Sequence, residues 1–258
     1  MNAAHLIRHQ FRYERKRFLR DPAEVFFALA FPLIFLFVFA AMLGNGTESG
    51  HVAGHLLNDA NYYLPAVLTI SLVAANFVNL SISLTAARER GVLKRVRGTP
   101  LPLWVFMAAR IAMGLAVSVL LVILTVLVGR LFYGVALPTF TLPAVILTLV
   151  LASMSLCALG FALTAAVRSE GAAAALANLI ALPLYFLSGL FAHNDMMPAS
   201  VRHLGEVFPV SHIFTASALA FDPAATGSGL RPWDLAVVGG WGIAGFLLAW
   251  RFFRWAPR

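Results

Sequence analysis

The feature that most constrains the fold is a series of long stretches without any charged side chain. Only 12% of the 258 residues are charged and 60% are apolar, whereas soluble proteins average about 25% charged residues. Several of the uncharged stretches reach the roughly 20 residues that a helix needs to cross about 30 Å of hydrocarbon. The sequence therefore predicts a polytopic membrane protein with helical spans. No nucleic-acid partner is expected, because no soluble domain is left to present the net charge of +8.

Six spans are expected, at about residues 23–43, 62–87, 111–129, 143–167, 171–192 and 233–250. The apolar stretch 207–221 is short for a crossing and suits a re-entrant or interfacial segment within an outer region, 193–232. With both termini inside, only Arg130, Arg202 and Arg231 lie outside, so the inner side holds 16 of the 19 Lys and Arg. This distribution is the one that the positive-inside rule favours.

Residues 1–22, ahead of the first span, are expected to form an amphipathic helix in the lipid headgroup layer. Its apolar face lies opposite many Arg and Lys side chains, and helices of this kind turn their cations toward anionic membrane lipid. Glu14 interrupts the apolar face, either because it is paired or because the helix is irregular there. Asp21 and Pro22 then read as a helix cap and a first-turn proline, which start the first span.

Residues 88–102 form the densest charged segment, with six charged side chains among the first ten positions. If this segment is helical, Arg90, Lys94 and Arg97 share one face, because they recur at spacings of four and seven residues. A break and helix restart at residues 98–100 would then make a compact basic elbow that projects from the membrane. A solvated loop that only sets the topology is an equally open interpretation.

The sequence offers little chemistry that could drive transport or catalysis. It has no G-x-x-x-x-G-K-[ST] phosphate loop, and no Asp, Glu, Lys or His lies well inside a predicted span, although secondary transporters usually need such groups. Arg110 is expected at a membrane edge. Cys157 is the single cysteine, which excludes a disulfide within the chain. His51 and His55 could bind a metal only if their loop were helical, so no metal site is expected.

Polar residues inside the spans form two groups that could line a pathway. These candidates are Thr69, Asn76, Asn79 and Ser83 on one face of the second span, and Asn178 and Tyr185 on the fifth. Ordinary hydrogen bonding between helices is an equally open interpretation. A stripe of small residues at Ala173, Ala177 and Ala181 permits close helix contact, either within the chain or between subunits.

The elbow carries a close resemblance to type-2 ABC transporter permeases, the membrane subunits of daunorubicin-resistance-type drug exporters. Their cytoplasmic loop is similar to Glu89-Arg90-Gly91-Val92-Leu93-Lys94-Arg95-Val96-Arg97-Gly98-Thr99-Pro100-Leu101-Pro102. Their connecting helix, fifth span and outer region resemble Arg20-Asp21-Pro22, Pro183-Leu184-Tyr185-Phe186-Leu187-Ser188-Gly189, Met197-Pro198 and Phe208-Pro209. The sequence departs from the family at residues 192–196, where relatives often carry more apolar residues.

The resemblance implies that residues 1–258 form one all-α transmembrane domain that dimerises with a second copy or a paralogue. It implies separate ABC ATPase subunits, which bind ATP and Mg, while this chain holds no cofactor. The ATPase-coupling residues would be Glu89, Arg90, Gly91, Leu93, Lys94, Arg95, Val96, Arg97, Gly98, Thr99 and Pro100. Within this set, Leu93 and Val96 would supply an apolar contact to the ATPase.

The expected function is ATP-driven export of an amphipathic drug-like, lipid or glycolipid substrate. The expected location is the bacterial cytoplasmic membrane, with both termini in the cytoplasm. Two alternatives from other classes stay open. One is a membrane-embedded lipid-modifying enzyme, which would need converging acids or histidines at the membrane surface. The other is an ATP-independent secondary transporter, which the uncharged spans disfavour.

Overall fold

A computed structural model describes residues 3–43, 50–52, 55–57, 59–98, 101–133, 140–191, 198–222 and 228–252. Within these ranges the chain is almost entirely helical. The α-helices are α1 (Ala3–Arg20), α2 (Pro22–Val25), α3 (Phe31–Leu43), α4 (Asp59–Val73), α5 (Leu80–Glu89), α6 (Val92–Arg97), α7 (Leu103–Tyr133), α8 (Leu142–Ala166), α9 (Glu170–Leu187), α10 (Ala199–Gly205), α11 (Pro209–Ala220) and α12 (Pro232–Phe252). Two π-helical segments, η1 (Phe26–Ala30) and η2 (Ala74–Asn79), join α2 to α3 and α4 to α5. The strands β1 (Gly50–Val52) and β2 (His55–Leu57) pair as a short antiparallel hairpin.

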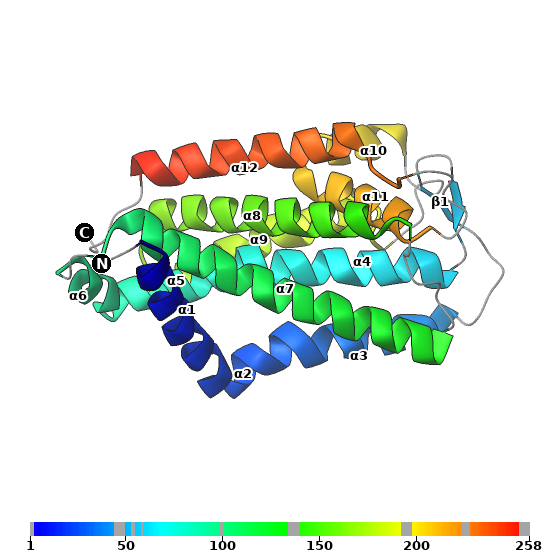
Figure 1. Cartoon of the computed structure of the whole chain (residues 1–258). Helices are drawn as coiled ribbons and strands as arrows, with labels where there is room; N and C mark the ends of the chain where they lie inside the picture. Colours follow the sequence, from blue (N-terminus) through cyan, green and yellow to red (C-terminus); the bar gives the residue numbers. More distant parts are fainter. Residues whose placement is uncertain are drawn as a thin grey trace.

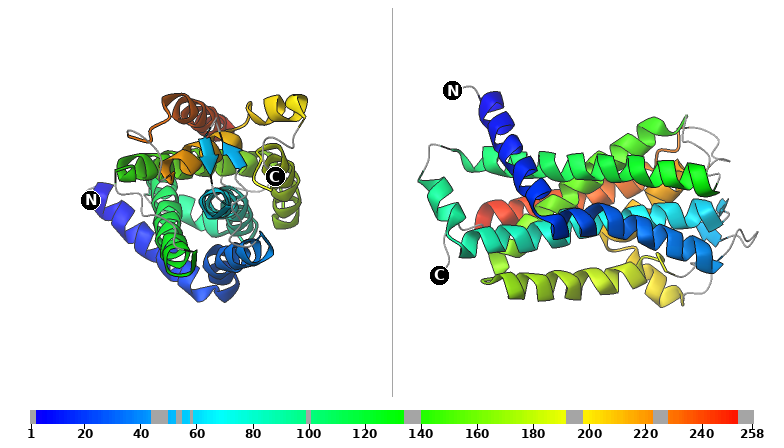
Figure 2. Two further views of the ribbon diagram at one scale, coloured as in Figure 1. Left: turned by 90° about the vertical axis from the view of Figure 1, so that its right-hand side faces the viewer. Right: turned by 90° about the horizontal axis from the view of Figure 1, so that it is seen from below.

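The long helices lie side by side in a bundle with two different ends (Figure 1). One end carries α6, the start of α1 and the link between α8 and α9, and is called the basic end for the Arg and Lys side chains of α1 and α6. The other end carries the β1–β2 hairpin, α10 and α11, and is called the hairpin end. The described chain starts with α1 at the basic end and returns there at the end of α12 (Figures 1 and 2).

Five helices have the length and hydropathy to cross a membrane, if α4, η2 and α5 are counted as one. The apolar run from Pro22 provides a sixth as part of a pair with α1 that bends by 89°. Outer helix faces expose large apolar side chains such as Ile123, Leu127 and Ile243, which lipid covers far more favourably than water does. The prediction of an all-α polytopic membrane protein is therefore confirmed.

Helix starts coincide with local capping chemistry in the sequence. Asp21 caps α2 because its carboxylate accepts a hydrogen bond from the Glu24 backbone N–H at 3.0 Å, and Pro22 fills the first turn. Ser169 caps α9 in the same way, since its hydroxyl accepts from the Ala172 N–H at 3.2 Å. These caps fix where the bend after α1 and the turn between α8 and α9 occur.

The interior is built around α8 and the continuous rod of α4, η2 and α5. The largest cluster of buried apolar residues joins these helices to α9, α11 and α12, and Figure 2 shows α4 surrounded by other helices. Ala173, Ala177 and Ala181 of α9 are all buried in this cluster. The small-residue stripe therefore serves packing within the chain.

Three local features differ from the sequence-based expectation. Helix α7 begins at Leu103, and the Pro102 carbonyl accepts a hydrogen bond from the Phe106 N–H. A helix was expected to start at Thr99-Pro100, which lie outside the described residues, but residues 101 and 102 are not helical. Arg110 lies two turns inside α7, so this helix begins before the predicted span 111–129. The segment with His51 and His55 is a hairpin rather than a helix, so the condition for a metal pair there is not met.

The outer region between the fifth and sixth spans contains two short helices, α10 and α11. At 1.5 Å per residue, the 12 residues of α11 extend over about 18 Å, which is too short to cross. The length of α11 thus agrees with the expected re-entrant or interfacial segment. Residues 192–197 of this region lie outside the described ranges.

Candidate functional site

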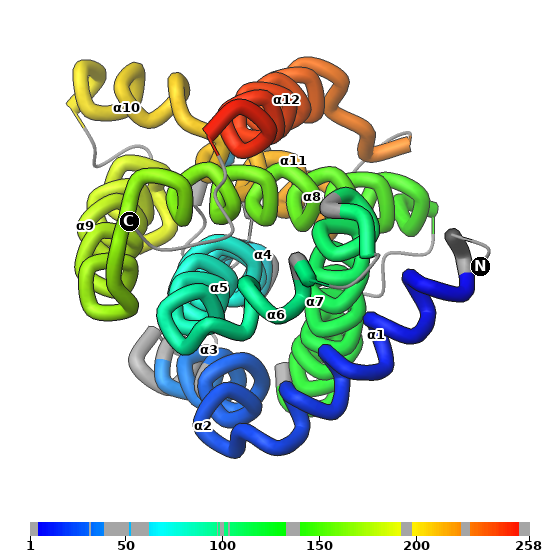
Figure 3. Tube along the Cα trace, turned by 90° about the vertical axis from the view of Figure 1, so that its left-hand side faces the viewer, coloured from blue at the N-terminus to red at the C-terminus, as the bar shows by residue number. Residues whose placement is uncertain are grey.

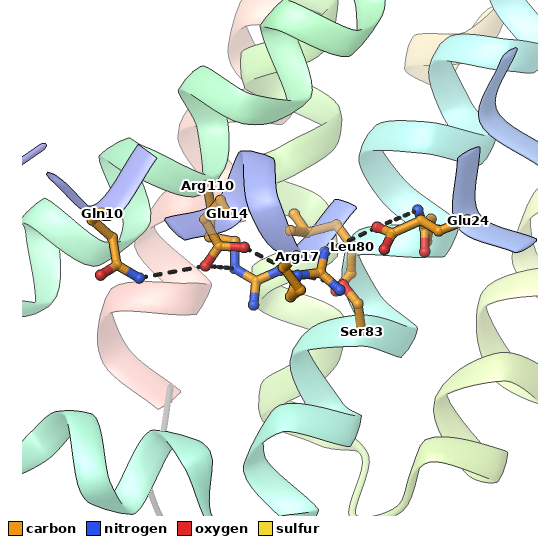
Figure 4. A network of polar contacts seen from close by, with 8 residues as sticks. Gln10, Glu14, Arg17, Glu24, Leu80, Ser83 and Arg110 are labelled. Carbon is orange, nitrogen blue, oxygen red and sulfur yellow. Dashed lines mark hydrogen bonds and ion pairs between the residues drawn. The ribbon is translucent and has the colours of Figure 1, made fainter. Parts of the chain in front are cut away.

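A buried ion pair joins the amphipathic helix α1 to the bundle near the basic end. Glu14 of α1 is 1% exposed and Arg110 of α7 is 5% exposed, and their Oε1 and Nε atoms lie 3.1 Å apart. Arg110 also donates a long hydrogen bond to the Ser83 hydroxyl of α5. Figure 4 shows these side chains converging from three different helices. An ion pair with so little water around it holds together only if both charges are present.

Arg17 and Glu24 extend this ion pair into a network across the 89° bend. Arg17 lies 3.2 Å from Glu14 Oε2 and 2.9 Å from Glu24 Oε1. Asn79 of η2 donates to the same Glu24 oxygen at 3.1 Å. Burial lowers the pKa of Arg17, but Glu24 and Glu14 outweigh it and raise the pKa overall. Arg17 therefore stays charged and ties α1 to α2 on one side while Asn79 ties α2 to the central rod.

A cavity of about 730 Å³ opens beside this network at the basic end. Its volume falls in the range of about 300–1,000 Å³ that is typical of small-molecule sites. Charged and amide groups line it next to apolar and aromatic ones, including Tyr13, Glu14, Arg17, Glu24, Phe27, Asn79, Ser83, Phe106, Arg110, Glu170 and Asn178. The cavity therefore offers both ionic and apolar contacts to a molecule of drug-like size.

The polar residues expected on one face of the second span have different surroundings. Asn76 donates to the Ser118 hydroxyl of α7 at 2.8 Å and lies 3.4 Å from the Cys157 sulfur of α8. Asn79 and Ser83 line the cavity, whereas Thr69 is fully buried and donates to the Pro65 carbonyl. Asn76 and Asn79 belong to the π-helical segment η2, which shifts the helical phase between Thr69 in α4 and Ser83 in α5. The prediction of one shared face assumed a regular α-helix.

The two polar residues of the fifth span also separate. Tyr185 is buried and donates to the Ile70 carbonyl of α4 at 3.3 Å. Asn178 is exposed on the chain, lines the cavity and donates to the Ala174 carbonyl of its own helix. Asn178, Asn79 and Ser83 are thus the predicted pathway residues that line the cavity of about 730 Å³.

The basic elbow consists of a turn at residues 90–91 followed by α6. Gly91 has φ of +70°, a left-handed conformation that glycine adopts without strain, so α5 does not continue into α6 as one helix. Leu93 is 1% exposed and packs with Leu84 and Phe106 in a core cluster that Val96 also contacts. Leu93 therefore anchors α6 to its own chain and is not the surface contact that was expected.

The exposed side of the elbow is cationic. Arg90, Lys94 and Arg95 are exposed, and Gly98 ends α6. Figure 3 shows α6 at the end of the bundle that faces the viewer. Glu89 and Arg90 both interact with Glu170 at the start of α9. Thr99 and Pro100 lie outside the described residues, and the Arg97 side chain is not described. A rigidly anchored α6 that presents cations outward suits contact with an acidic protein surface.

The hairpin end is tightly packed where the basic end is hollow. Tyr62 of α4 donates to the Gly189 carbonyl after α9, and its ring packs edge-to-face against Phe214 of α11 with centroids 5.2 Å apart. A Cβ atom at Gly205 of α10 would collide with the Leu187 carbonyl. These contacts show that α4, the end of α9, α10 and α11 pack closely together at the hairpin end.

His212 of α11 joins the outer region to α12. Its Nδ1 lies 2.6 Å from Asp234 Oδ1 and its Nε2 lies 2.7 Å from the Glu206 carbonyl. Both partners are acceptors, so the ring satisfies both contacts only as an imidazolium that donates from each nitrogen. Arg231 holds the other Asp234 oxygen at 2.9 Å. The hydrogen bond with Asp234 raises the pKa of His212, with the Glu206 carbonyl adding to the effect and burial opposing it.

The hairpin end is expected to loosen as the pH rises. Because the pKa of His212 is raised on folding, its stabilisation is complete below the ordinary histidine pKa of about 6.5 and is lost as pH rises through the raised value. The loss should reach about 1.5–3 kcal/mol, the contribution of one charge-assisted hydrogen bond. Thermal unfolding in detergent across this pH range measures it.

His203 provides a matched control for this prediction, because its side chain is 68% exposed in the same outer region. His212→Gln should flatten the dependence of unfolding temperature on pH, whereas His203→Gln should preserve it. An unchanged pH profile in His212→Gln would contradict the assignment of the imidazolium.

Sequence reasoning left both buried charge clusters unassigned. Glu14 on the apolar face of an amphipathic helix was a usable signal, as was Arg110 ahead of an otherwise uncharged span, but nothing in the sequence pairs them. Asp234 and His212 stand near the ends of separate elements and gave no periodic pattern. Among the described residues, no three His, Cys, Asp or Glu side chains gather as a metal site.

The amino-acid sequence matches a known protein family and two of its named proteins. A family model described as ABC-2 type transporter matches residues 5–221. The chain is 24% identical over 199 residues to the putative transport permease YvfS of Bacillus subtilis (strain 168), covering 77% of this chain and 78% of that protein. It is 30% identical over 207 residues to the daunorubicin resistance ABC transporter permease protein DrrB1 of Streptomyces coeruleorubidus, covering 78% and 69%.

A multi-pass helical bundle with an amphipathic N-terminal helix and a cavity of small-molecule size is the architecture of a membrane transport subunit. The chain belongs to the ABC-2 type transporter family, which confirms the resemblance carried by the elbow. It is the membrane transport subunit of an ABC transporter, not itself an enzyme. Transporters of this family work in general with an ABC ATPase.

Proposed function

We propose that this chain is the membrane subunit of an ATP-driven exporter and that a separate ATPase, which binds ATP and Mg, docks on its basic end. The observation that carries the proposal is the elbow: α6 is fixed to the bundle by Leu93 and turns Lys94 and Arg95 outward. Residues 88–102 are the coupling segment, and residues 1–22 form a connecting helix that the Glu14–Arg110 pair fastens to α7.

The substrate proposed is an amphipathic compound, either drug-like or a lipid or glycolipid. The cavity supports this proposal because it combines the polar groups of Asn79, Ser83 and Asn178 with aromatic side chains of α1 and η1. The position of the cavity at the basic end supports an inward-facing state. DrrB1 is named for daunorubicin resistance, which makes daunorubicin a rational first probe and multidrug resistance a testable phenotype.

The proposed location is the bacterial cytoplasmic membrane, with the basic end and both termini in the cytoplasm. The excess of Lys and Arg at this end supports the orientation, and exposed cations of α1 such as Arg12 and Lys16 suit anionic lipid headgroups. A dimer with a second copy or a paralogue is proposed because α9 exposes Asn178 beside Leu179 and Leu182. A polar side chain on an apolar helix face gains from a protein partner in the membrane.

Purification of the tagged chain from its native membranes in mild detergent tests the proposal. An ABC ATPase should co-purify, and proteoliposomes of the complex should move daunorubicin in an ATP-dependent, vanadate-sensitive manner. Transport by the chain alone without nucleotide would instead indicate a secondary transporter. Turnover of a membrane lipid by the chain without a partner would indicate a lipid-modifying enzyme.

A further inference from the structure

Arg88, the next-to-last residue of α5, binds the end of α8. Its side chain is 6% exposed; Nη1 donates to the Thr164 carbonyl at 2.7 Å and Nη2 donates to the Val167 carbonyl. Carbonyls in the last turn of a helix have no partner within that helix, and a cation is favourable there because of the helix dipole. Arg88 therefore caps α8 from a different helix.

Glu89, the neighbouring residue, binds the start of α9. Its Oε2 atom accepts a hydrogen bond from the Glu170 backbone N–H at 2.9 Å. The N–H groups in the first turn of a helix are also unpaired, and the dipole there favours an anion. The cation Arg88 thus binds the C-terminal end of α8, and the neighbouring anion Glu89 binds the N-terminal end of α9.

This pair connects the chain just before α6 to the junction of α8 with α9. Residues 167–169 are the whole connection between α8 and α9, so a group that holds both of its ends fixes the junction. Only the turn at residues 90–91 separates the pair from α6, which Leu93 anchors. From the junction, α9 runs along the cavity and carries Asn178. A displacement of α6 therefore reaches the start of α9 through Arg88 and Glu89.

We propose that Arg88 and Glu89 are positioning residues that make α6 and the first turn of α9 move as one unit. The movement itself rests on the proposed function, because an ATPase docked on α6 would drive it. The physical linkage does not depend on that function, so the two can be tested separately.

Electron paramagnetic resonance distances test the linkage in the full-length permease. In a Cys157→Ala background, one spin label replaces Val92, the half-buried first residue of α6, so that the cations proposed to contact the ATPase stay in place. A second label replaces Gly171, which is exposed and where a Cβ meets no atom within 4 Å. The labelled protein that retains both Arg88 and Glu89 should give a narrow distribution of distances between the labels. Arg88→Met should broaden it by releasing the end of α8. Glu89→Ala should broaden it less, because the exposed Arg90–Glu170 ion pair still joins the elbow to α9.

Arg168→Met is the matched control, because Arg168 lies in the same junction but is exposed. An unbroadened distribution in both Glu89→Ala and Arg88→Met, or an equal broadening in Arg168→Met, would overturn the inference. Glu89 is exposed, so its variant keeps the test valid if Arg88→Met does not fold. When the ATPase complex receives ATP, the distance between the two labels should stay constant while Arg88 and Glu89 are both present. In Arg88→Met it should change. A complex with no nucleotide response in any variant would count against the proposed function alone.

Discussion

Replacing Glu14 by Leu is expected to destabilise the protein by about 3–5 kcal/mol, the cost of leaving one buried charge without its partner. The exposed fraction of Arg110 is 5%, and Glu14 is the carboxylate that it contacts. Without Glu14, the guanidinium keeps the long hydrogen bond to Ser83 and a cation–π contact with the Phe106 ring, neither of which supplies a negative charge. Arg110→Met should be destabilising as well, because it leaves Glu14 buried with Arg17 as its remaining cation. Denaturant unfolding in detergent micelles measures both effects.

The double variant Glu14→Leu/Arg110→Met distinguishes an ion pair from two independent packing sites. It removes both charges and leaves Arg17 paired with Glu24, so it should be more stable than the worse single variant. Glu206→Gln serves as the control, since its ion pair with His203 is exposed on both sides and contributes about 0–1 kcal/mol. Additive losses in the double variant would contradict the coupling of Glu14 to Arg110.

Reversing the charge of the elbow with Lys94→Glu/Arg95→Glu is expected to abolish co-purification of the ATPase. Both side chains are exposed, so the fold should be retained, while like charges placed across an interface cost several kcal/mol. A loss of 1.4 kcal/mol already weakens binding about tenfold. Pull-down from detergent extract, followed by ATPase activity of the recovered complex, gives the measurement.

Two control variants locate the effect. Arg12→Glu/Lys16→Glu reverses exposed charges on α1, at the same end of the bundle, and Arg202→Glu reverses an exposed charge at the hairpin end. Binding should survive Arg202→Glu fully and the α1 variant largely, because α6 carries the contact. Equal losses in the α1 and α6 variants would assign docking to the overall charge of the basic end instead.

The order of the spans could be predicted because each depends on one local property, the length of an uncharged run; the structure has five such helices, or six with the bent pair. The helix cap at Asp21 is local too, and the structure places the bend after α1 there. The pairing of Arg110 with Glu14 could not be predicted, because it depends on two residues far apart in the sequence that share no local pattern.

The candidate site was harder to predict than the fold, because backbone irregularities rearranged it. The π-helical segment η2 contains Asn76 and Asn79 and gives them different surroundings, and no residue pattern predicted it. The faces of the elbow were predicted for one continuous helix, but Gly91 interrupts that helix. Leu93 consequently packs into the core. The residue types of the elbow indicated its cationic character. The directions in which the side chains point depend on the left-handed conformation of Gly91.

Photo-crosslinking in intact cells tests the central claim most directly. A photoreactive amino acid is placed at Arg95 on α6 in one strain and at Arg202 on α10 in another, both exposed positions. The account predicts that the Arg95 position forms an adduct with an ABC ATPase, identified by mass spectrometry, and that the Arg202 position does not. An ATPase adduct at Arg202, or none at Arg95 while transport is active, would contradict it.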